Sequence, residues 1–417
     1  MNLAPPTLTN WAGNISFRPA AVHRPRSVSE VQLLVARSEH LRVLGSGHSF
    51  NRIADTPGEM LVLHDMAPTV EVDTANARAR VAGAMRYGEL MGPLHAAGFA
   101  LPNTGSLPHI SVAGACATGT HGSGVGNQVL AGVVSAVELV RADGELVTVR
   151  RGDPGFDGSV LALGAMGVVT HLTLDLLPTF EVRQVVYDGL TREALHENLE
   201  AVMGSAYSVS VFTDHRAGTG AQVWQKRTDL ADPAREWLGA HLADGPRHPV
   251  PGEDPAACTT QGGIAGPWHE RLPHFRLDFT PSSGDELQSE YFVPTEHGRA
   301  AVEVLADLAE EMDPLLMISE LRTVAADEMW LSPAQGRDSV VLHFTWHPDT
   351  AGVTAFLPRL EQRLTELGAR PHWGKVNTMD PATVRGLFPR LADARALLHE
   401  HDPAGKLRNE LVDRYLR

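Results

Sequence analysis

Cysteine is nearly absent from this sequence of 417 residues. Cys116 and Cys258 are the only two, and neither has a second cysteine at CxxC spacing. A disulfide framework and a zinc–thiolate site are therefore excluded, and we expect no bound metal. Because unpaired cysteines suit a reducing compartment, we expect the protein to be cytoplasmic.

Positive charge and long apolar runs are also in short supply. The 35 Lys and Arg residues face 50 Asp and Glu residues, and the formal net charge is −15 with no basic block. Such a chain is a poor binder of nucleic-acid phosphates. No apolar run reaches the roughly 18 residues of a membrane helix, and the first ten residues lack the features of a secretory signal. We expect a soluble protein that binds neither nucleic acid nor membrane, and a monomer because no exposed apolar stripe is evident.

Common nucleotide-binding and catalytic fingerprints are missing too. The sequence has no GxGxxG opening a βαβ unit, no GxxxxGK[ST] loop, no GxSxG elbow and no HExxH pair. Any nucleotide must therefore be held by a different architecture. Glycine, in contrast, is plentiful at 39 residues, which indicates many turns and close backbone contacts.

The length suits two or three domains, and residues 1–180 have the pattern of an α+β domain. Ser27 and Glu30 form a capping box that predicts a helix start, and a short strand at 41–44 ends at Gly45. Alternating and short apolar runs predict further strands. Residues 133–149 read as a hairpin, because Asp143-Gly144 suits the positive φ angles of a tight turn.

A second region, residues 181–375, carries longer strand candidates and predicts one large antiparallel sheet. Helix candidates near 296–312 and 350–366 would cover one of its faces. Residues 228–268, rich in Pro and Gly, read as a long irregular excursion. Residues 376–417 predict short helices that pack back on the first domain. The predicted strands lie at 207–214, 221–227, 288–294, 315–325 and 339–347.

Two glycine-rich segments are the strongest sign of a ligand site. Gly45-Ser46-Gly47-His48-Ser49 directly follows a buried-looking strand, where exposed backbone N–H groups suit a pyrophosphate. By itself this segment would fit a tight turn equally well. Residues 103–127 are so small and apolar that they resemble backbone wrapped around a large ligand.

Polar residues at alternating positions suggest a second part of the site. Glu320 and Arg322 share one strand face with Leu316 and Ile318, so both charges need partners; a mutual structural ion pair would explain them as well. His343, Thr345 and His347 also share a face, but no nearby carboxylate or cysteine completes a metal ligand set. Lys375 follows His372, Trp373 and Gly374, which is more typical of a site wall than of a solvated surface.

Several motifs together resemble the vanillyl-alcohol oxidase family of flavoproteins, and within it the alditol oxidases of the xylitol and sorbitol oxidase type. The resemblance covers nearly the whole chain. It implies a two-domain fold, with an α+β FAD-binding domain and a substrate domain built on a large antiparallel sheet covered by helices. The motifs lie at residues 43–50, 101–124, 164–176, 266–275, 279–291, 321–338, 343–347, 370–376 and 402–406.

FAD is the cofactor that this resemblance implies, with a covalent bond from the His48 imidazole to the flavin 8α-methyl group. Such a tether prevents cofactor loss and raises the flavin potential. The other residues implied to contact FAD, including a backbone contact at Val169, are Val43, Leu44, Gly45, Ser46, Gly47, Ser49, Ser106, Ser111, Gly114, Thr118, Gly119, Thr120, His121, Val169 and His372.

The implied substrate is a small polyol, whose hydroxyls would contact Ser106, Glu320, Arg322, Thr345 and Lys375. The implied reaction converts a terminal alcohol to the aldose by hydride transfer to flavin N5, with His343 and His372 close to the flavin. Arg322 and Lys375 would stabilise the developing alkoxide. Lys375 could instead act as the base if burial beside Arg322 lowers its pKa.

Gly105 corresponds to a position that is associated in this family with oxygen access, where many alditol oxidases have Ala. Its small size favours an oxidase that reduces O2 to H2O2. Two other readings stay open. One is an aldonolactone or sugar dehydrogenase of the same family that uses an electron carrier; the other is a sugar-binding protein without turnover, which the intact site residues disfavour.

Overall fold

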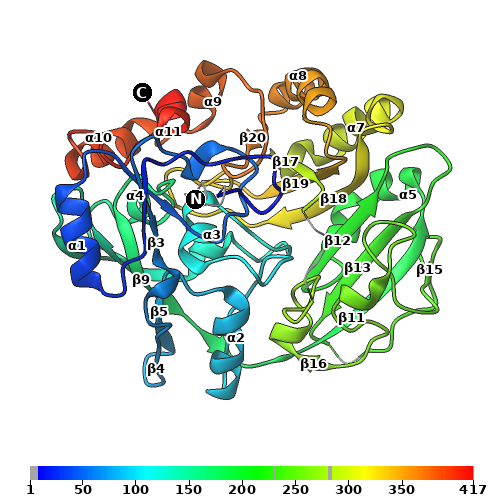
Figure 1. Ribbon diagram of the computed structural model, residues 1–417. Coiled ribbons are helices and arrows are strands. Elements are labelled where there is room, and N and C mark those ends of the chain that lie inside the picture. The colour runs from blue at the N-terminus through cyan, green and yellow to red at the C-terminus, as the bar shows by residue number, and fades with distance from the viewer. Residues whose placement is uncertain (1–7, 230, 280–283, 417) are drawn as a thin grey trace, which may run out of the picture.

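The computed structural model describes residues 8–229, 231–279 and 284–416 (Figure 1). Residues 280–283, part of one motif behind the family resemblance, lie outside the described residues. The chain forms several small sheets from its first 180 residues and one ten-stranded sheet from residues 181–371. The predicted α+β class with a large antiparallel sheet is confirmed.

The first 180 residues form three small sheets. The order β1-β3-β2 is parallel, whereas β4-β5-β9-β7-β8 and β10-β6 are antiparallel. The strands are β1 (Ala21–His23), β2 (Leu41–Leu44), β3 (Glu59–Val62), β4 (Val70–Asp73), β5 (Arg78–Ala82), β6 (Phe99–Ala100), β7 (Val134–Val140), β8 (Leu146–Arg150), β9 (Val168–Asp175) and β10 (Leu177–Pro178). The helices are α1 (Val28–Arg37), α2 (Tyr87–Ala96), α3 (Val112–Thr118) and α4 (Phe156–Val160).

Two local predictions in this region are confirmed with changes in detail. Ser27 caps α1 by accepting from the Glu30 N–H at 3.2 Å, but the Glu30 carboxylate accepts from the N–H of Arg26. The 134–150 hairpin turns at Gly144, whose φ is +89°. Asp143 does not have the positive φ that was predicted for both turn residues. Its carboxylate accepts from the Glu145 N–H, and only Gly144 takes the left-handed conformation.

The large sheet confirms the five predicted strands and adds five that were not predicted. Its order is β14-β15-β11-β13-β12-β18-β19-β17-β20, with β16 paired to β11, and every pairing is antiparallel. The strands are β11 (Glu181–Leu190), β12 (Ser208–Thr213), β13 (Ala221–Arg227), β14 (Glu236–Trp237), β15 (Ala240–Leu242), β16 (Gly266–Pro267), β17 (Leu287–Pro294), β18 (Leu316–Val324), β19 (Ser339–Trp346) and β20 (Arg370–Pro371).

Two corrections concern the large sheet. The first is β11, a ten-residue strand that was not predicted, because its polar residues at 183 and 184 break the apolar alternation that marks a strand. The second concerns residues 228–268. The excursion at 228–268 is not irregular throughout, because β14, β15 and β16 lie within it and extend the sheet beside β11. Backbone pairing thus overrides a composition rich in Pro and Gly.

Helices cover one face of β17–β19, as predicted (Figure 1). On that face the Tyr291 hydroxyl donates to Glu361 Oε1 at 2.7 Å, and the Trp346 ring packs edge-on to Phe356. Because side chains alternate along a strand, the intervening residues of β17–β19 point to the opposite face. The covering helices are α7 (Gly298–Met312) and α8 (Thr350–Glu366); α5 (Arg192–Glu197) packs against α7, and α6 (Leu199–Met203) packs against β12.

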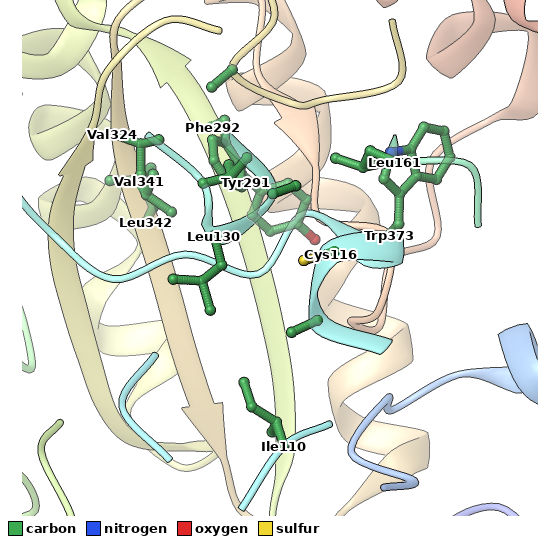
Figure 2. Packing of buried hydrophobic residues seen from close by; sticks show 14 of the residues in the cluster. Ile110, Cys116, Leu130, Leu161, Tyr291, Phe292, Val324, Val341, Leu342 and Trp373 are labelled. Atoms are coloured by element: carbon green, nitrogen blue, oxygen red, sulfur yellow. The ribbon is translucent and has the colours of Figure 1, made fainter. Parts of the chain in front are cut away.

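One hydrophobic cluster joins the two halves of the chain (Figure 2). Cys116 of α3 and Leu130 from the first half belong to the same cluster as Tyr291, Phe292 and Leu342 of the large sheet. This continuous core fixes the glycine-rich segments against β17–β19.

The chain after His372 forms α9 (Pro381–Leu387), α10 (Leu391–His401) and α11 (Glu410–Leu416). Lys406 Nζ donates to the carbonyls of Val35 and Ala142, each at 2.7 Å. The Asn409 amide donates to three carbonyls between residues 52 and 55. The last residues described are therefore anchored on the first part of the chain.

Candidate functional site

A cavity of about 590 Å³ lies between the glycine-rich segments and the face of the large sheet opposite α7 and α8. We call its lining residues from 43–51 and 105–121 the loop wall. We call Gln288, Glu290, Glu320, Arg322, His343 and Thr345 the sheet wall. His372, Gly374 and Lys375 also line the cavity, whose size suits a small-molecule or cofactor site.

The loop wall is held together where its two segments meet. The Ser111 N–H donates to Ser46 Oγ at 3.0 Å. A Cβ on Gly45 would lie 2.6 Å from Ser111 Oγ, and one on Gly114 would lie 2.7 Å from the same atom. A side chain at either position would therefore force the Ser111 hydroxyl to rotate away. The backbone of these segments is left facing the cavity.

His48 belongs to this wall. Its ring stacks on Trp11, with centroids 5.4 Å apart and an interplanar angle of 18°. Nδ1 is buried and has no hydrogen-bond partner among the residues that the structure describes. Burial lowers the pKa of His48 to about 4, so the imidazole is neutral and its nitrogen is available for a bond to a ligand.

Gly105 and Ser106 sit where the two walls meet. Ser106 Oγ accepts a hydrogen bond from Arg322 Nη2 at 3.0 Å. A Cβ on Gly105 would lie 3.2 Å from Ile110 Cδ1 and 3.6 Å from Thr120 Cγ2. A larger side chain at residue 105 would have to displace these neighbours or enter the cavity.

Strand register builds the sheet wall. Glu290, His343 and Glu320 are Cα partners across β17, β19 and β18, and form one row of side chains on the cavity face. The row beside it consists of Gln288, Thr345 and Ile318. Residues far apart in the sequence therefore become neighbours because side chains opposite each other in an antiparallel pair share a face.

Glu320 and Arg322 are both buried and form an ion pair, as one of the two sequence interpretations held. They also line the cavity, so the pair does not exclude the other interpretation, a role in ligand binding. Glu320 Oε1 lies 2.9 Å from His274 Nε2. Burial opposes ionisation of Glu320, but Arg322 and His274 hold its pKa well below the ordinary value.

A second buried carboxylate, Glu290, lies between two histidines. Its Oε1 is 2.7 Å from His121 Nε2, and its Oε2 is 2.5 Å from His343 Nδ1. Burial opposes ionisation of Glu290, but the charge and hydrogen bonds of these histidines, with His372 nearby, hold its pKa well below the ordinary value. His372 Nδ1 accepts from the Gly374 N–H at 3.0 Å, and burial lowers the pKa of His372 to about 3.

Lys375 closes the cavity beside both walls. Its Nζ donates to Gln288 Oε1 and lies 5.0 Å from the centre of the Phe50 ring. Burial lowers the pKa of Lys375; the Glu290 carboxylate opposes this shift and the Arg322 cation adds to it. The ammonium can therefore lose its proton more readily than an exposed lysine.

Most site residues expected from the sequence converge on this one cavity. The expected residues that line it are Val43, Leu44, Gly45, Ser46, Gly47, His48, Ser49, Gly105, Ser106, Ser111, Gly114, Thr118, Thr120, His121, Glu320, Arg322, His343, Thr345, His372 and Lys375. Within the described chain, Gly119 and Val169 are not lining residues. Gly119 ends α3 with φ +79° and faces Pro333 and Leu161, and Val169 pairs with Leu139 in the small antiparallel sheet.

Other residues depart from the expectations. His347 follows the end of β19 and is exposed, so it does not share the buried face of His343 and Thr345. Gln288 and Glu290 line the cavity but were not predicted, although they alternate along a buried apolar strand just as Glu320 and Arg322 do. His274 lines the cavity from the loop before β17 and carried no periodic signal.

Two general features of the described residues bear on the chemistry. They contain no group of three or more His, Cys, Asp or Glu side chains placed to hold a metal ion. Within the same ranges, no helix combines the length and the apolar character needed to cross a membrane.

Comparison with known proteins places these features in a family. A model described as an FAD binding domain matches residues 19–150, and one described as D-arabinono-1,4-lactone oxidase matches residues 285–415. The chain is 51% identical to an alditol oxidase of a Streptomyces species over 97% of this chain and 98% of that protein. It is 26% identical to an L-gulono-1,4-lactone dehydrogenase of Mycobacterium tuberculosis over 99% of both chains.

Solved structures agree on the fold. A solvent-stable cholesterol oxidase has a TM-score of 0.80 at 16% identity, covering 99% of this chain and 97% of that one. A glucooligosaccharide oxidase from Acremonium strictum, described with a 6-S-cysteinyl, 8α-N1-histidyl FAD, has a TM-score of 0.74 at 14% identity, covering 98% and 94%. At these identities the likeness concerns architecture alone.

Proposed function

Because this chain belongs to the alditol oxidase branch of the vanillyl-alcohol oxidase flavoprotein family, we propose that it oxidises the terminal CH2OH group of an alditol such as xylitol or sorbitol to the aldehyde and reduces O2 to H2O2. The observation that carries this proposal is the polar cluster of Ser106 with the buried Glu320 and Arg322 in the cavity that the glycine-rich loops also line. A neutral polyol offers only hydroxyl groups, so its recognition needs several fixed polar partners of this kind.

The residues of the loop wall fit FAD. Gly45 and Gly114 leave the backbone bare, and His48 lines the cavity with a buried Nδ1 that has no hydrogen-bond partner within the described chain. When bound, FAD supplies a two-electron acceptor for the alcohol and returns the electrons to O2. The residues that would hold it are Val43, Leu44, Gly45, Ser46, Gly47, His48, Ser49, Ser106, Ser111, Gly114, Thr118, Gly119, Thr120, His121, Val169 and His372.

His48 is the residue that would carry the cofactor covalently. The glucooligosaccharide oxidase is described with an 8α-N1-histidyl FAD, and the neutral, partner-free Nδ1 of His48 among the described residues supports the same linkage here. Stacking on Trp11 fixes the plane of the imidazole before any bond forms.

Ser106, Glu320, Arg322, Thr345 and Lys375 would bind the polyol hydroxyls. Glu320 is ionised and accepts hydrogen bonds, while Arg322 and Lys375 donate them. As the alcohol proton leaves, the developing negative charge on oxygen is stabilised by these two cations in a buried site. His343, held by Glu290 at 2.5 Å, keeps a fixed ring orientation beside Thr345.

Lys375 could stabilise the alkoxide by charge alone or accept the alcohol proton as a base. Its lowered pKa supports both roles. We expect Lys375→Arg to retain much of the activity if charge is sufficient, because arginine keeps the cation but does not accept a proton at ordinary pH. Undiminished turnover of this variant would exclude the base role.

The function is tested by mixing the purified holoenzyme anaerobically with xylitol or sorbitol, following the flavin absorbance, and then admitting air. Bleaching followed by fast recovery in air is the expected result. Bleaching that persists in air would favour a dehydrogenase that uses an electron carrier. No bleaching with any alditol, but bleaching with an aldonolactone, would overturn the assignment of the substrate.

We also propose a monomer in the cytoplasm with an FAD-binding domain at 1–180, a substrate domain at 181–375 and a C-terminal segment at 376–417. The two free cysteines, both buried, support a reducing compartment. The contacts of Lys406 and Asn409 with residues 35–55 support packing of the C-terminal segment on the first domain. Light scattering of the purified protein tests the monomer.

A further inference from the structure

Behind the cavity, a buried lysine is linked to the sheet wall through one histidine. Lys226 on β13 is 1% exposed. Its Nζ donates to the Leu272 carbonyl and lies 2.8 Å from His274 Nδ1. The other ring nitrogen of His274, Nε2, lies 2.9 Å from Glu320 Oε1. One line of hydrogen bonds thus runs from Lys226 to the carboxylate that would bind the polyol.

The backbone around His274 also contacts the loop wall. The backbone N–H groups of His274 and Phe275 both donate to the Ser106 carbonyl, at 3.1 and 3.2 Å. Ser106 Oγ in turn accepts from Arg322. His274 is therefore placed between Glu320 and Ser106, two of the groups proposed to contact substrate.

Lysine is a rare choice in this chain, which contains only three, Lys226, Lys375 and Lys406. Elsewhere in the interior the chain uses arginine to satisfy carbonyls, as at Arg42 and Arg370. Arginine keeps its proton at all ordinary pH values, whereas a buried lysine can lose it. The presence of lysine next to His274 therefore allows the charge at this position to change.

The donors and acceptors around His274 fix its tautomer. A lysine ammonium has only donors, so His274 Nδ1 must accept when Lys226 is charged. Burial and the Lys226 cation lower the pKa of His274 to about 4, so the ring carries one proton. That proton must be on Nε2, where it is donated to Glu320.

Resting on the proposed function, we propose that Lys226 is a positioning residue for alditol binding. Lys226 orients His274, and His274 Nε2 donates to Glu320 Oε1. This hydrogen bond fixes the orientation of the carboxylate, so that its remaining acceptor sites face the polyol hydroxyls. Lys226 itself is not among the residues lining the cavity in the described chain, so its effect on substrate passes through His274.

This device gives substrate binding a defined pH dependence. The charged and titratable groups that face Lys226 are His274, Glu320, Arg322 and Cys258. Burial raises the pKa of the Cys258 thiol to about 12, and Glu320 and Arg322 stay ionised. Burial lowers the pKa of Lys226 to about 7, against the opposing effect of Glu320. Above this pH Lys226 becomes neutral, and its amine can accept a hydrogen bond from His274 Nδ1. The Nε2 lone pair of His274 then faces the Glu320 carboxylate, the hydrogen bond that orients Glu320 is lost, and alditol binding weakens.

The test compares KM and kcat for xylitol from pH 6 to 9 in the wild type, Lys226→Met and Lys226→Arg. In the wild type we expect KM to rise roughly tenfold across this range, the effect of one charge-assisted hydrogen bond, with little change in kcat. Lys226→Met should have the high KM at every pH. Lys226→Arg should keep the low KM to a higher pH than the wild type does.

Lys406→Met is the matched control, because it removes the other lysine outside the cavity. Lys406 holds the carbonyls of Val35 and Ala142, so we expect a lower melting temperature but a wild-type dependence of KM on pH. A Lys226→Met enzyme with wild-type KM values and pH dependence would overturn the proposal.

A second measurement needs neither activity nor a stable Met variant. Histidine-selective 15N NMR of the wild-type holoenzyme reports the tautomer of His274, whose signals are identified by their loss in His274→Gln. We expect the Nε2–H form at pH 6. An Nδ1–H form at this pH would overturn the inference. If the wild type oxidises no alditol but shows the expected tautomer, the proposed function fails while the Lys226–His274 contact stands.

Discussion

The two walls of the cavity are built in different ways. The loop wall comes from two continuous segments and presents backbone groups where side chains are missing, as at Gly45 and Gly114. The sheet wall takes its side chains from β17, β18 and β19 and presents buried charge, as at Glu290 and Glu320. The loop wall should therefore be sensitive to added volume, and the sheet wall to lost charge.

Each buried carboxylate of the sheet wall contacts two side chains that stabilise its charged form. Glu290 lies between His121 and His343, and Glu320 lies between Arg322 and His274. Removing one partner of a buried pair typically costs about 3–5 kcal/mol, because the other charge is left uncompensated. In the loop wall His121 belongs to the Glu290 cluster, whereas His48 is the residue proposed to react with the cofactor.

The largest effect should come from the one chemically reactive residue of the loop wall. In His48→Ala we expect the complete loss of covalently bound flavin, because the imidazole that would form the bond is gone. Flavin fluorescence of the protein band on a denaturing gel measures this. His64→Ala, which changes an exposed histidine, should keep the fluorescent band. A fluorescent His48→Ala band would contradict the assignment.

Loss of charge from the sheet wall should come next. Arg322→Met leaves the buried Glu320 carboxylate without its cation and removes one stabiliser of the alkoxide. We expect kcat/KM for xylitol to fall by about 10²–10³-fold, with the flavin content unchanged. The control is Arg299→Met, which breaks an exposed pair with Glu200 and should change kcat/KM little. Equal losses of kcat/KM in both variants would contradict a specific role for the buried Arg322 in the site.

Added volume can be tested at the junction of the walls. Gly105→Leu places a side chain against Ile110 and Thr120 or into the cavity. We expect reoxidation by O2 to slow about tenfold, or 1.4 kcal/mol of barrier, with a smaller effect on reduction by xylitol. Stopped-flow measurement of the two half-reactions separates them. Equal slowing of both would count against a role in oxygen access.

A smaller steric effect is expected deeper in the loop wall. Gly45→Ala forces Ser111 Oγ away from a Cβ that would lie at 2.6 Å. This change should cost about 1 kcal/mol of unfolding free energy, at the low end for overpacking because a hydroxyl can rotate, and lower the flavin content. Gly386→Ala in α9 is the matched control, since no described atom other than its chain neighbours and its own helix backbone lies within 4 Å of the position that its methyl group would take. It should be neutral or stabilise by about 0.5–1 kcal/mol. Similar losses in both, measured by chemical unfolding, would contradict the close approach.

Acid should weaken the sheet side of the molecule gradually. Burial lowers the pKa values of His215 and His274 to about 4 and that of His372 to about 3, from 6.5. Below pH 6.5 these histidines are therefore protonated in the unfolded chain but remain neutral in the folded chain. As a result, the free energy of unfolding falls as the pH drops toward 4.

We expect the melting temperature to fall by about 5–10 °C between pH 7 and pH 5. His215→Asn removes one of the three groups and should reduce this fall, because asparagine tolerates the φ of +62° at this position. A melting temperature that is constant over this range would contradict the buried neutral histidines.

Much of the fold was predictable from local pattern. The strands that form β12, β13, β17, β18 and β19 and the helices α7 and α8 follow the apolar periodicity of the sequence. β11 was not predicted because Arg183 and Gln184 break the alternation, and they are tolerated since Arg183 donates to the Gly263 carbonyl and Gln184 donates to the Thr259 carbonyl. Their partners come from a loop about 80 residues away, which no local window contains.

The sequence by itself determined the loop wall, because its glycines, Ser46 and His48 lie within two short segments whose chemistry is legible in order. It also determined that Glu320 and Arg322 share a face, because alternation is a property of a single strand. Only the tertiary structure decided that Glu290 meets His121 and His343, and that Lys226 reaches Glu320 through His274. Register between strands and the path of the loop before β17 set these contacts, and both depend on packing over the whole chain rather than on neighbours in sequence.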